Sequence, residues 1–131
     1  MALAGRGLDS YRQTQAQSRT PLELVVMLYD GALRFLGTAR EAIERRDIPA
    51  RREALSRTLA IISELQSTLK MDEGGELAAS LDQLYGYANL RLLDAASQND
   101  VKPLDEVRKV FEILRDAWSG IASPAAAGTH P

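Results

Sequence analysis

Apolar side chains recur at alternating intervals of three and four residues in four successive stretches of the chain. The first stretch begins behind Thr20 and Pro21 and ends near Arg46. Its apolar positions are Leu22, Val25, Tyr29, Ala32, Leu36, Ala39 and Ile43. This spacing places one apolar stripe on one face of an α-helix. Thr20 can cap this helix, Pro21 suits its first position, and Glu23 completes a capping box.

Three further stretches repeat the pattern, separated by residues that end helices. The breaks fall at Asp47-Ile48-Pro49, at a turn over Met71-Asp72-Glu73-Gly74-Gly75 that ends in a glycine pair, and at Gln98-Asn99-Asp100, with Pro103 in the next first turn. The apolar positions are Leu55, Thr58, Ile62, Leu65 and Leu69, then Leu77, Leu81, Leu84, Ala88, Leu92 and Ala95, then Leu104, Val107, Phe111, Leu114, Trp118 and Ile121. The sequence therefore predicts four amphipathic helices.

Short connections between such helices favour an all-α, antiparallel up-down four-helix bundle, because consecutive helices then become neighbours around one core. We expect the bundle to span residues 18–122. Residues 1–17 are mostly polar and predict a flexible N-terminal arm. Residues 123–131 have almost nothing to bury and predict a disordered C-terminal tail.

The first predicted helix carries more apolar surface than one core stripe requires. A second stripe beside the first consists of Leu24, Met27, Leu28, Gly31 and Phe35, and Val26 and Leu33 extend it. Part of this surplus should face solvent, another subunit or a ligand. Met27 beside Gly31 would form a groove that a partner helix can enter closely. Gly31 would equally allow tight packing inside the bundle, and periodicity leaves both readings open.

The composition of the chain and its lack of catalytic motifs limit the classes of function that it can have. The 131 residues suffice for one domain, the formal net charge is −2, and the chain has no cysteine. We find no signal-peptide pattern and no apolar stretch that could span a membrane, and we predict a cytoplasmic protein. The single histidine, His130, lies beside the end of the chain. No nucleotide, metal or cofactor motif is present, so we predict no cofactor and no enzymatic activity.

Two charged features admit functional readings. Asp30 lies within the surplus surface, where an acceptor for a partner's hydrogen bond or an ordinary exposed helix residue is a better interpretation than a catalytic carboxylate. An arginine cluster surrounds the first helix junction and could bind RNA. Its members are Arg40, Arg45, Arg46, Arg51 and Arg52. Acidic residues interleave with them, which favours a salt-paired turn, and we predict no nucleic-acid partner.

Several motifs together resemble a known family. The run SRTPLELVVMLYDGALRFL, residues 18–36, resembles the first helix of the FliS family of flagellin export chaperones, in which a (Ser/Thr)-Pro cap precedes a Met-Leu-Tyr-Asp-Gly-Ala core. Three further stretches match the family in order: residues 61–69, then residues 74–76 and 84–85, then residues 104–107 and 114–118. Tyr11 and Gln13 match an N-terminal element of the family less closely. The resemblance spans residues 8 to 119.

This resemblance implies a function. Members of the family bind the disordered C-terminal segment of flagellin, which folds into short helices on the bundle, prevent its premature polymerisation and deliver it to the flagellar export gate. The residues that we expect to bind flagellin by this analogy are Leu8, Tyr11, Leu24, Met27, Leu28, Asp30 and Gly31. Tyr29 shares the motif but also lies on the core stripe.

Two other functional classes remain open from the residues alone. The surplus stripe could bury against a second copy of the chain, as in a homo-oligomeric scaffold, and we expect a monomer or a weak homodimer. A small RNA-binding regulator would use the arginine cluster and bind nucleic acid with a steep dependence on salt.

Overall fold

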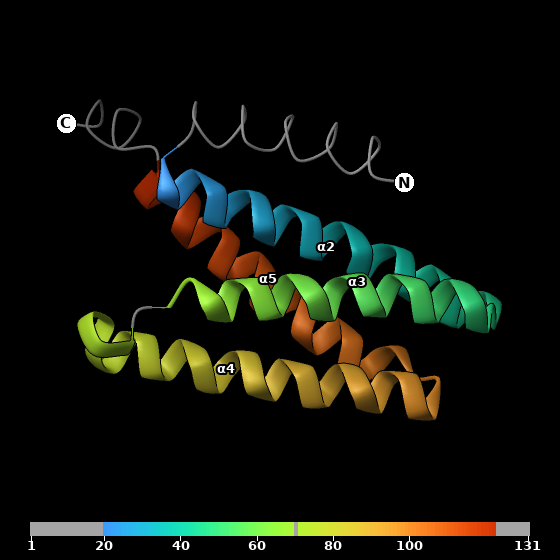
Figure 1. Ribbon diagram of the computed structural model, residues 1–131. Helices are drawn as coiled ribbons and strands as arrows, with labels where there is room; N and C mark the ends of the chain where they lie inside the picture. The colour runs from blue at the N-terminus through green and yellow to red at the C-terminus, as the bar shows by residue number, and fades with distance from the viewer. Residues whose placement is uncertain (1–19, 70, 123–131) are drawn as a thin grey trace, which may run out of the picture.

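The computed structural model describes residues 20–69 and 71–122, which form four α-helices in a bundle (Figure 1). The helices are α2 (Pro21–Arg45), α3 (Ile48–Ser67), α4 (Met71–Gln98) and α5 (Val101–Ala122). Each helix contacts the next, and α5 returns to contact α2, so that antiparallel neighbours close a ring. The packing of α2 against α3 is the most extensive. The predicted all-α bundle is confirmed, and the predicted arm and tail lie outside the described residues.

The start of α2 follows the chemistry predicted for it. Glu23 donates its backbone N–H to Thr20 Oγ1 at 3.1 Å, and the Glu23 carboxylate accepts from the Thr20 backbone N–H at 3.5 Å. This is a complete capping box. At the other end Arg46 adopts the left-handed conformation (φ 58°), and Asp47 caps α3 by accepting the Ala50 N–H at 3.1 Å.

Gly74 and Gly75 lie at a kink inside α4. Gly75 has φ 57° and ψ −135°, a conformation that side chains disfavour, and it kinks α4. A helical turn precedes the kink, however, where the sequence predicts only a turn. A Cβ atom at Gly74 would lie only 2.5 Å from the Ala78 Cβ. Gly74 is therefore required by close packing across the kink.

Matched glycine-to-alanine substitutions should therefore have opposite effects. Gly37→Ala adds a methyl group in the middle of α2 with nothing within 4 Å, and it should raise the free energy of unfolding by about 0.5–1 kcal/mol through helix propensity. Gly74→Ala should lower it, because the methyl group meets the Ala78 Cβ at 2.5 Å. Urea denaturation of both variants measures the difference, and two shifts of the same sign would contradict the packing described here.

The core contains the predicted stripes and one aromatic group at its centre. Tyr29, Tyr85 and Phe111 are fully buried, and the Phe111 ring centroid lies 5.2 Å from that of Tyr29 and 6.3 Å from that of Tyr85. The hydroxyls of Tyr29 and Tyr85 form a hydrogen bond at 2.5 Å, which joins α2 to α4. Burial raises the pKa of Tyr85 far above its ordinary value, and the hydrogen bond to Tyr29 adds to this. Burial also raises the pKa of Tyr29.

This tyrosine pair should make the bundle unstable to alkali. A tyrosine with a raised pKa in the folded state ionises at a lower pH in the unfolded chain than in the bundle. Its contribution to the free energy of unfolding is therefore fully present below pH ~10 and is lost as the pH rises from there towards the folded pKa. Tyr85 should lower the free energy of unfolding by about 1.4 kcal/mol between pH 9 and pH 11, and the raised pKa of Tyr29 should add to this loss. Urea denaturation of the wild type and of Tyr85→Phe at several pH values should show that the free energy of unfolding falls less steeply with pH in the variant. Equal pH dependence in the two proteins would refute the role of the tyrosine pair in alkaline unfolding.

Candidate protein-binding surface

The surplus apolar stripe of α2 is only partly used by the bundle. Gly31 is buried, Leu24 and Leu28 are half-buried, and Met27 keeps 41% of its surface exposed. Leu8 and Tyr11, the other apolar residues expected to bind a partner, lie outside the described residues. The structure thus brings Leu24, Met27 and Leu28 together on the N-terminal half of α2. We call these three residues the α2 surface.

Gly31 lies where α2 and α3 approach closely. A Cβ atom at this position would meet the Cδ1 atom of Ile61 on α3 at 3.2 Å, which is tighter than an ordinary van der Waals contact. This geometry favours the interpretation that Gly31 serves packing inside the bundle. The glycine sits beside the α2 surface but does not open a groove of its own.

Asp30 is already engaged with another helix. Its Oδ1 atom accepts a hydrogen bond from Arg115 Nε at 2.7 Å, and Arg115 Nη2 lies 3.5 Å from Oδ2. The hydrogen bond to Asp30 raises the pKa of Arg115 above its usual value. The pair joins α2 to α5 and remains partly exposed, so a partner that contacts Asp30 has to share it with Arg115. Arg115 is 85 positions away in the chain, and no local pattern points to it.

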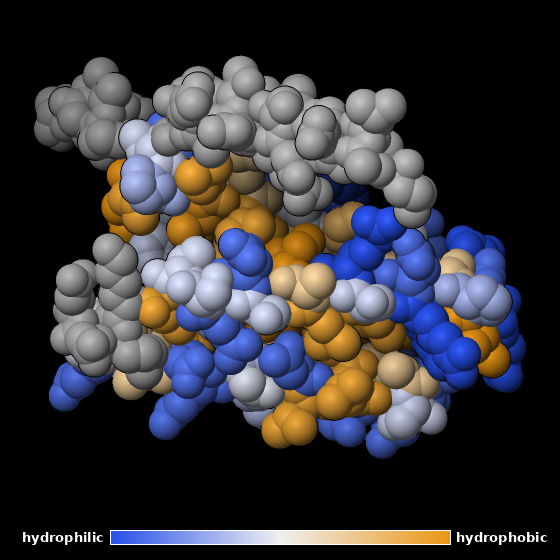
Figure 2. Space-filling view, in the orientation of Figure 1, coloured by the Kyte–Doolittle hydropathy of each residue, from blue (hydrophilic) through white to orange (hydrophobic). Residues whose placement is uncertain are grey.

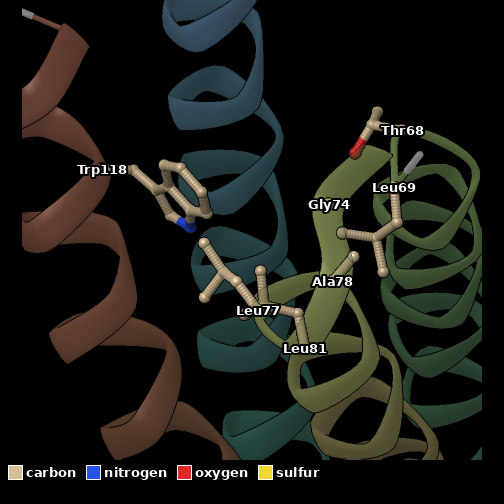
Figure 3. A pocket seen from close by; sticks show the side chains of 7 residues that line it. All are labelled: Thr68, Leu69, Gly74, Leu77, Ala78, Leu81 and Trp118. Atoms are coloured by element: carbon tan, nitrogen blue, oxygen red, sulfur yellow. The ribbon is translucent and has the colours of Figure 1, made fainter. Parts of the chain in front are cut away.

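A second apolar surface lies at the end of the bundle where α4 begins and α5 ends. An open cavity of about 260 Å³ lies there, and Trp118 of α5 faces Leu77 and Leu81 of α4 across it (Figure 3). The remaining lining residues are Thr68, Leu69, Gly74 and Ala78. Leu77 and Ile121 are 63% and 56% exposed, although the sequence pattern places both on core stripes. We call this feature the end cavity.

Apolar side chains also reach solvent along α4 and α5. Tyr87, Leu90 and Leu93 on α4 and Ile113 on α5 are exposed, and apolar patches interrupt the polar surface along α4 (Figure 2). Single exposed apolar residues are ordinary. Several on one helix, together with the α2 surface and the end cavity, are typical of proteins that bind other proteins.

Two members of the arginine cluster form ion pairs with neighbouring carboxylates. Arg40 pairs with Glu44 at 2.8 Å and with Asp105 at 2.9 Å, whereas Arg45 lies within 4.0 Å of Glu41 and Asp47. Arg51 donates to the Asn99 side-chain oxygen at 2.9 Å. The carboxylate pairs of Arg40 and Arg45 support the salt-paired turn and weaken the RNA-binding interpretation, because they compensate part of the positive charge that phosphates would need.

Within residues 20–69 and 71–122, no group of three or more His, Cys, Asp or Glu side chains could hold a metal ion. None of the helices in that part of the chain is long and apolar enough to cross a membrane. The features that the structure does present, a small helical bundle with several exposed apolar surfaces, define the class of helical protein-binding modules.

Comparison with known proteins places the chain within that class. Residues 4–125 match the family model described as "Flagellar protein FliS". The flagellar secretion chaperone FliS of Salmonella typhimurium is 36% identical over 125 residues, covering 92% of this chain and 93% of the relative. FliS of Campylobacter jejuni is 40% identical (84% and 86% covered), and FliS of Bacillus subtilis is 39% identical (83% and 80% covered). The chain therefore belongs to the FliS family of flagellar secretion chaperones.

Proposed function

We propose that this chaperone binds the C-terminal segment of flagellin in the cytoplasm, keeps it from polymerising prematurely and delivers it to the flagellar export gate. The observation that carries the proposal is the exposure of Met27, at 41%, between the half-buried leucines of the α2 surface. A large flexible apolar side chain in this setting suits contact with an amphipathic helix.

Coupled folding and binding explains why such a surface stays open in the free protein. Family resemblance implies that the end of flagellin is disordered in the monomer and helical in the filament. A segment of this kind gains helical structure when a partner supplies apolar surface, and it hides its own apolar face at the same time. Bound flagellin would then lack the surface through which it assembles.

The residues proposed to contact flagellin are those expected from the sequence. Leu24, Met27 and Leu28 would supply apolar contacts, while Asp30 would accept a hydrogen bond alongside Arg115. Gly31 would keep α2 and α3 close beneath the bound segment. Leu8 and Tyr11 would act from the N-terminal arm.

A polymerisation assay tests the proposal. Purified flagellin from the same organism is seeded with filament fragments, and light scattering is followed with and without an equimolar amount of the chaperone. We expect the chaperone to suppress filament growth. The matched control is binding to flagellin truncated at its C-terminal segment, which should be lost in size-exclusion chromatography. Unchanged growth, or equal binding to the truncated flagellin, would refute the proposal.

A homo-oligomeric scaffold is the second candidate, because Leu90 and Leu93 expose apolar surface on α4, away from the core. An isologous contact through this helix would bury them. Analytical ultracentrifugation at two concentrations distinguishes the candidates. A sedimentation coefficient that rises with concentration, and falls back in Leu90→Glu, would favour self-association.

A further inference from the structure

One aromatic and two cationic side chains form a cluster on the seam between α2 and α3. Phe35 of α2 is half-buried, and the guanidinium carbons of Arg34 and Arg57 lie 5.7 and 5.6 Å from the centroid of its ring. Both distances fall within the range over which an aromatic face attracts a cation. The two arginines come from different helices, so Phe35 holds two positive charges near the same point of the surface.

The charges of this cluster are not balanced. Arg57 donates from Nε to the Glu53 carboxylate at 2.9 Å, which compensates one of them. Arg34 forms no ion pair with any residue of the described part of the chain, although Arg40, Arg91 and Arg115 there each hold a carboxylate. Among residues 20–69 and 71–122, nothing pairs with the hydrogen-bonding edge of the exposed Arg34 guanidinium, which lies over the Phe35 ring.

The cluster adjoins the surface to which flagellin is proposed to bind. Arg34 Nη2 lies 4.0 Å from the position that a Cβ atom would occupy at Gly31. Met27, Gly31 and Arg34 are spaced by four and three residues, which places them on one face of α2. With a rise of 1.5 Å per residue, Met27 and Arg34 lie about 10 Å apart along the helix axis. A helix laid over Met27 would therefore reach Arg34 within two turns.

We propose that Arg34, held against Phe35, binds a carboxylate of the flagellin segment. The partner residue is an Asp or Glu about 10 Å along the bound helix, or roughly seven residues, from the apolar side chain that contacts Met27. Guanidinium groups suit this role because their planar N–H edge can donate two parallel hydrogen bonds to a carboxylate while the face stays stacked on an aromatic ring. The pairing would fix the register of a segment that apolar contacts alone let slide. This inference rests on the proposed function.

Calorimetric titration of the full chain with a synthetic peptide covering the C-terminal segment of its own flagellin tests the inference. Arg34→Gln removes the charge and should weaken binding about tenfold, since the lost hydrogen bonds involve charged groups. Arg52→Gln is the control, because Arg52 is also exposed and lacks a carboxylate partner in the described part, but lies five residues from Arg57 on another face of α3. Binding by this control should equal that of the wild type.

A peptide series makes the test specific. Each acidic residue of the peptide is replaced in turn by its amide. One replacement should weaken binding to the wild type about tenfold and have no further effect on Arg34→Gln, which demonstrates coupling between the two groups. Wild-type affinity in Arg34→Gln, or the absence of any coupled acidic position, would overturn the inference and leave flagellin binding intact. Failure of the wild type to bind the peptide would overturn the proposed function and this inference with it.

Discussion

Replacing Phe111 with alanine should lower the free energy of unfolding by about 3–5 kcal/mol, the largest stability loss that we expect from any single change in the chain. Phe111 is fully buried and lies between Tyr29 of α2 and Tyr85 of α4, so its removal leaves a cavity where three of the helices meet. The Tyr29–Tyr85 hydrogen bond limits how far the two rings can move to fill that space.

Ile113→Ala provides the matched control for this experiment. Ile113 lies two residues further along α5 and is 63% exposed, so its substitution should change the free energy of unfolding by no more than about 0.5 kcal/mol. Urea denaturation followed by circular dichroism measures both variants. Comparable losses in the two would show that the core does not centre on the aromatic group.

Replacing Met27 with glutamate should weaken binding of the flagellin segment at least about a hundredfold, because an unpaired charge would be buried under the bound helix. Helicity and thermal stability should stay close to those of the wild type, since Met27 is 41% exposed in the free protein. Calorimetric titration with the flagellin peptide gives the affinity, and circular dichroism gives the stability.

Two variants control for this substitution. Met27→Leu keeps an apolar side chain of similar size and should retain most of the affinity. Gln83→Glu adds the same negative charge at an exposed position on α4 and should have little effect. If Met27→Glu unfolds the bundle, the side chain belongs to the core and the binding surface lies elsewhere.

The four helices and their order could be predicted because periodicity and capping residues act locally. The Thr20–Glu23 capping box and the break between α2 and α3 occur where the sequence predicts them. The core stripe of α2 is buried along most of its length, at Tyr29, Ala32, Leu36, Ala39 and Ile43. In these cases the residues that decide the structure lie within a few positions of one another.

Some residues differ in burial from the predicted stripes, and they show which features of the packing periodicity does not predict. Leu77 has the angular position of a core residue but lines the open end cavity, and Ile121 lies in the last turn of α5, one residue before its end. Tyr85 falls outside the predicted stripe of α4 and is nonetheless buried, with its ring near Phe111 and its hydroxyl bonded to that of Tyr29. A repeat along one helix gives the direction of a side chain but does not say which neighbour it meets.

The candidate site was predictable only in outline. The motif on α2 indicates where apolar surface gathers, and the exposure of Met27 agrees with it. The pairing of Asp30 with Arg115 and the contact of Phe35 with Arg57 join residues far apart in sequence, so they follow from the packing of the helices. Whether Gly31 serves the bundle or a partner likewise depends on Ile61 of the neighbouring helix.

Calorimetric titration of the full chain with the C-terminal flagellin peptide, at several temperatures, shows whether the bundle binds this segment and folds it. We expect one-to-one binding with a negative heat-capacity change, because apolar surface on the bundle and on the peptide is buried together, and a gain in helicity by circular dichroism as the peptide folds. Absence of binding, or binding without a gain in helicity, would contradict this expectation.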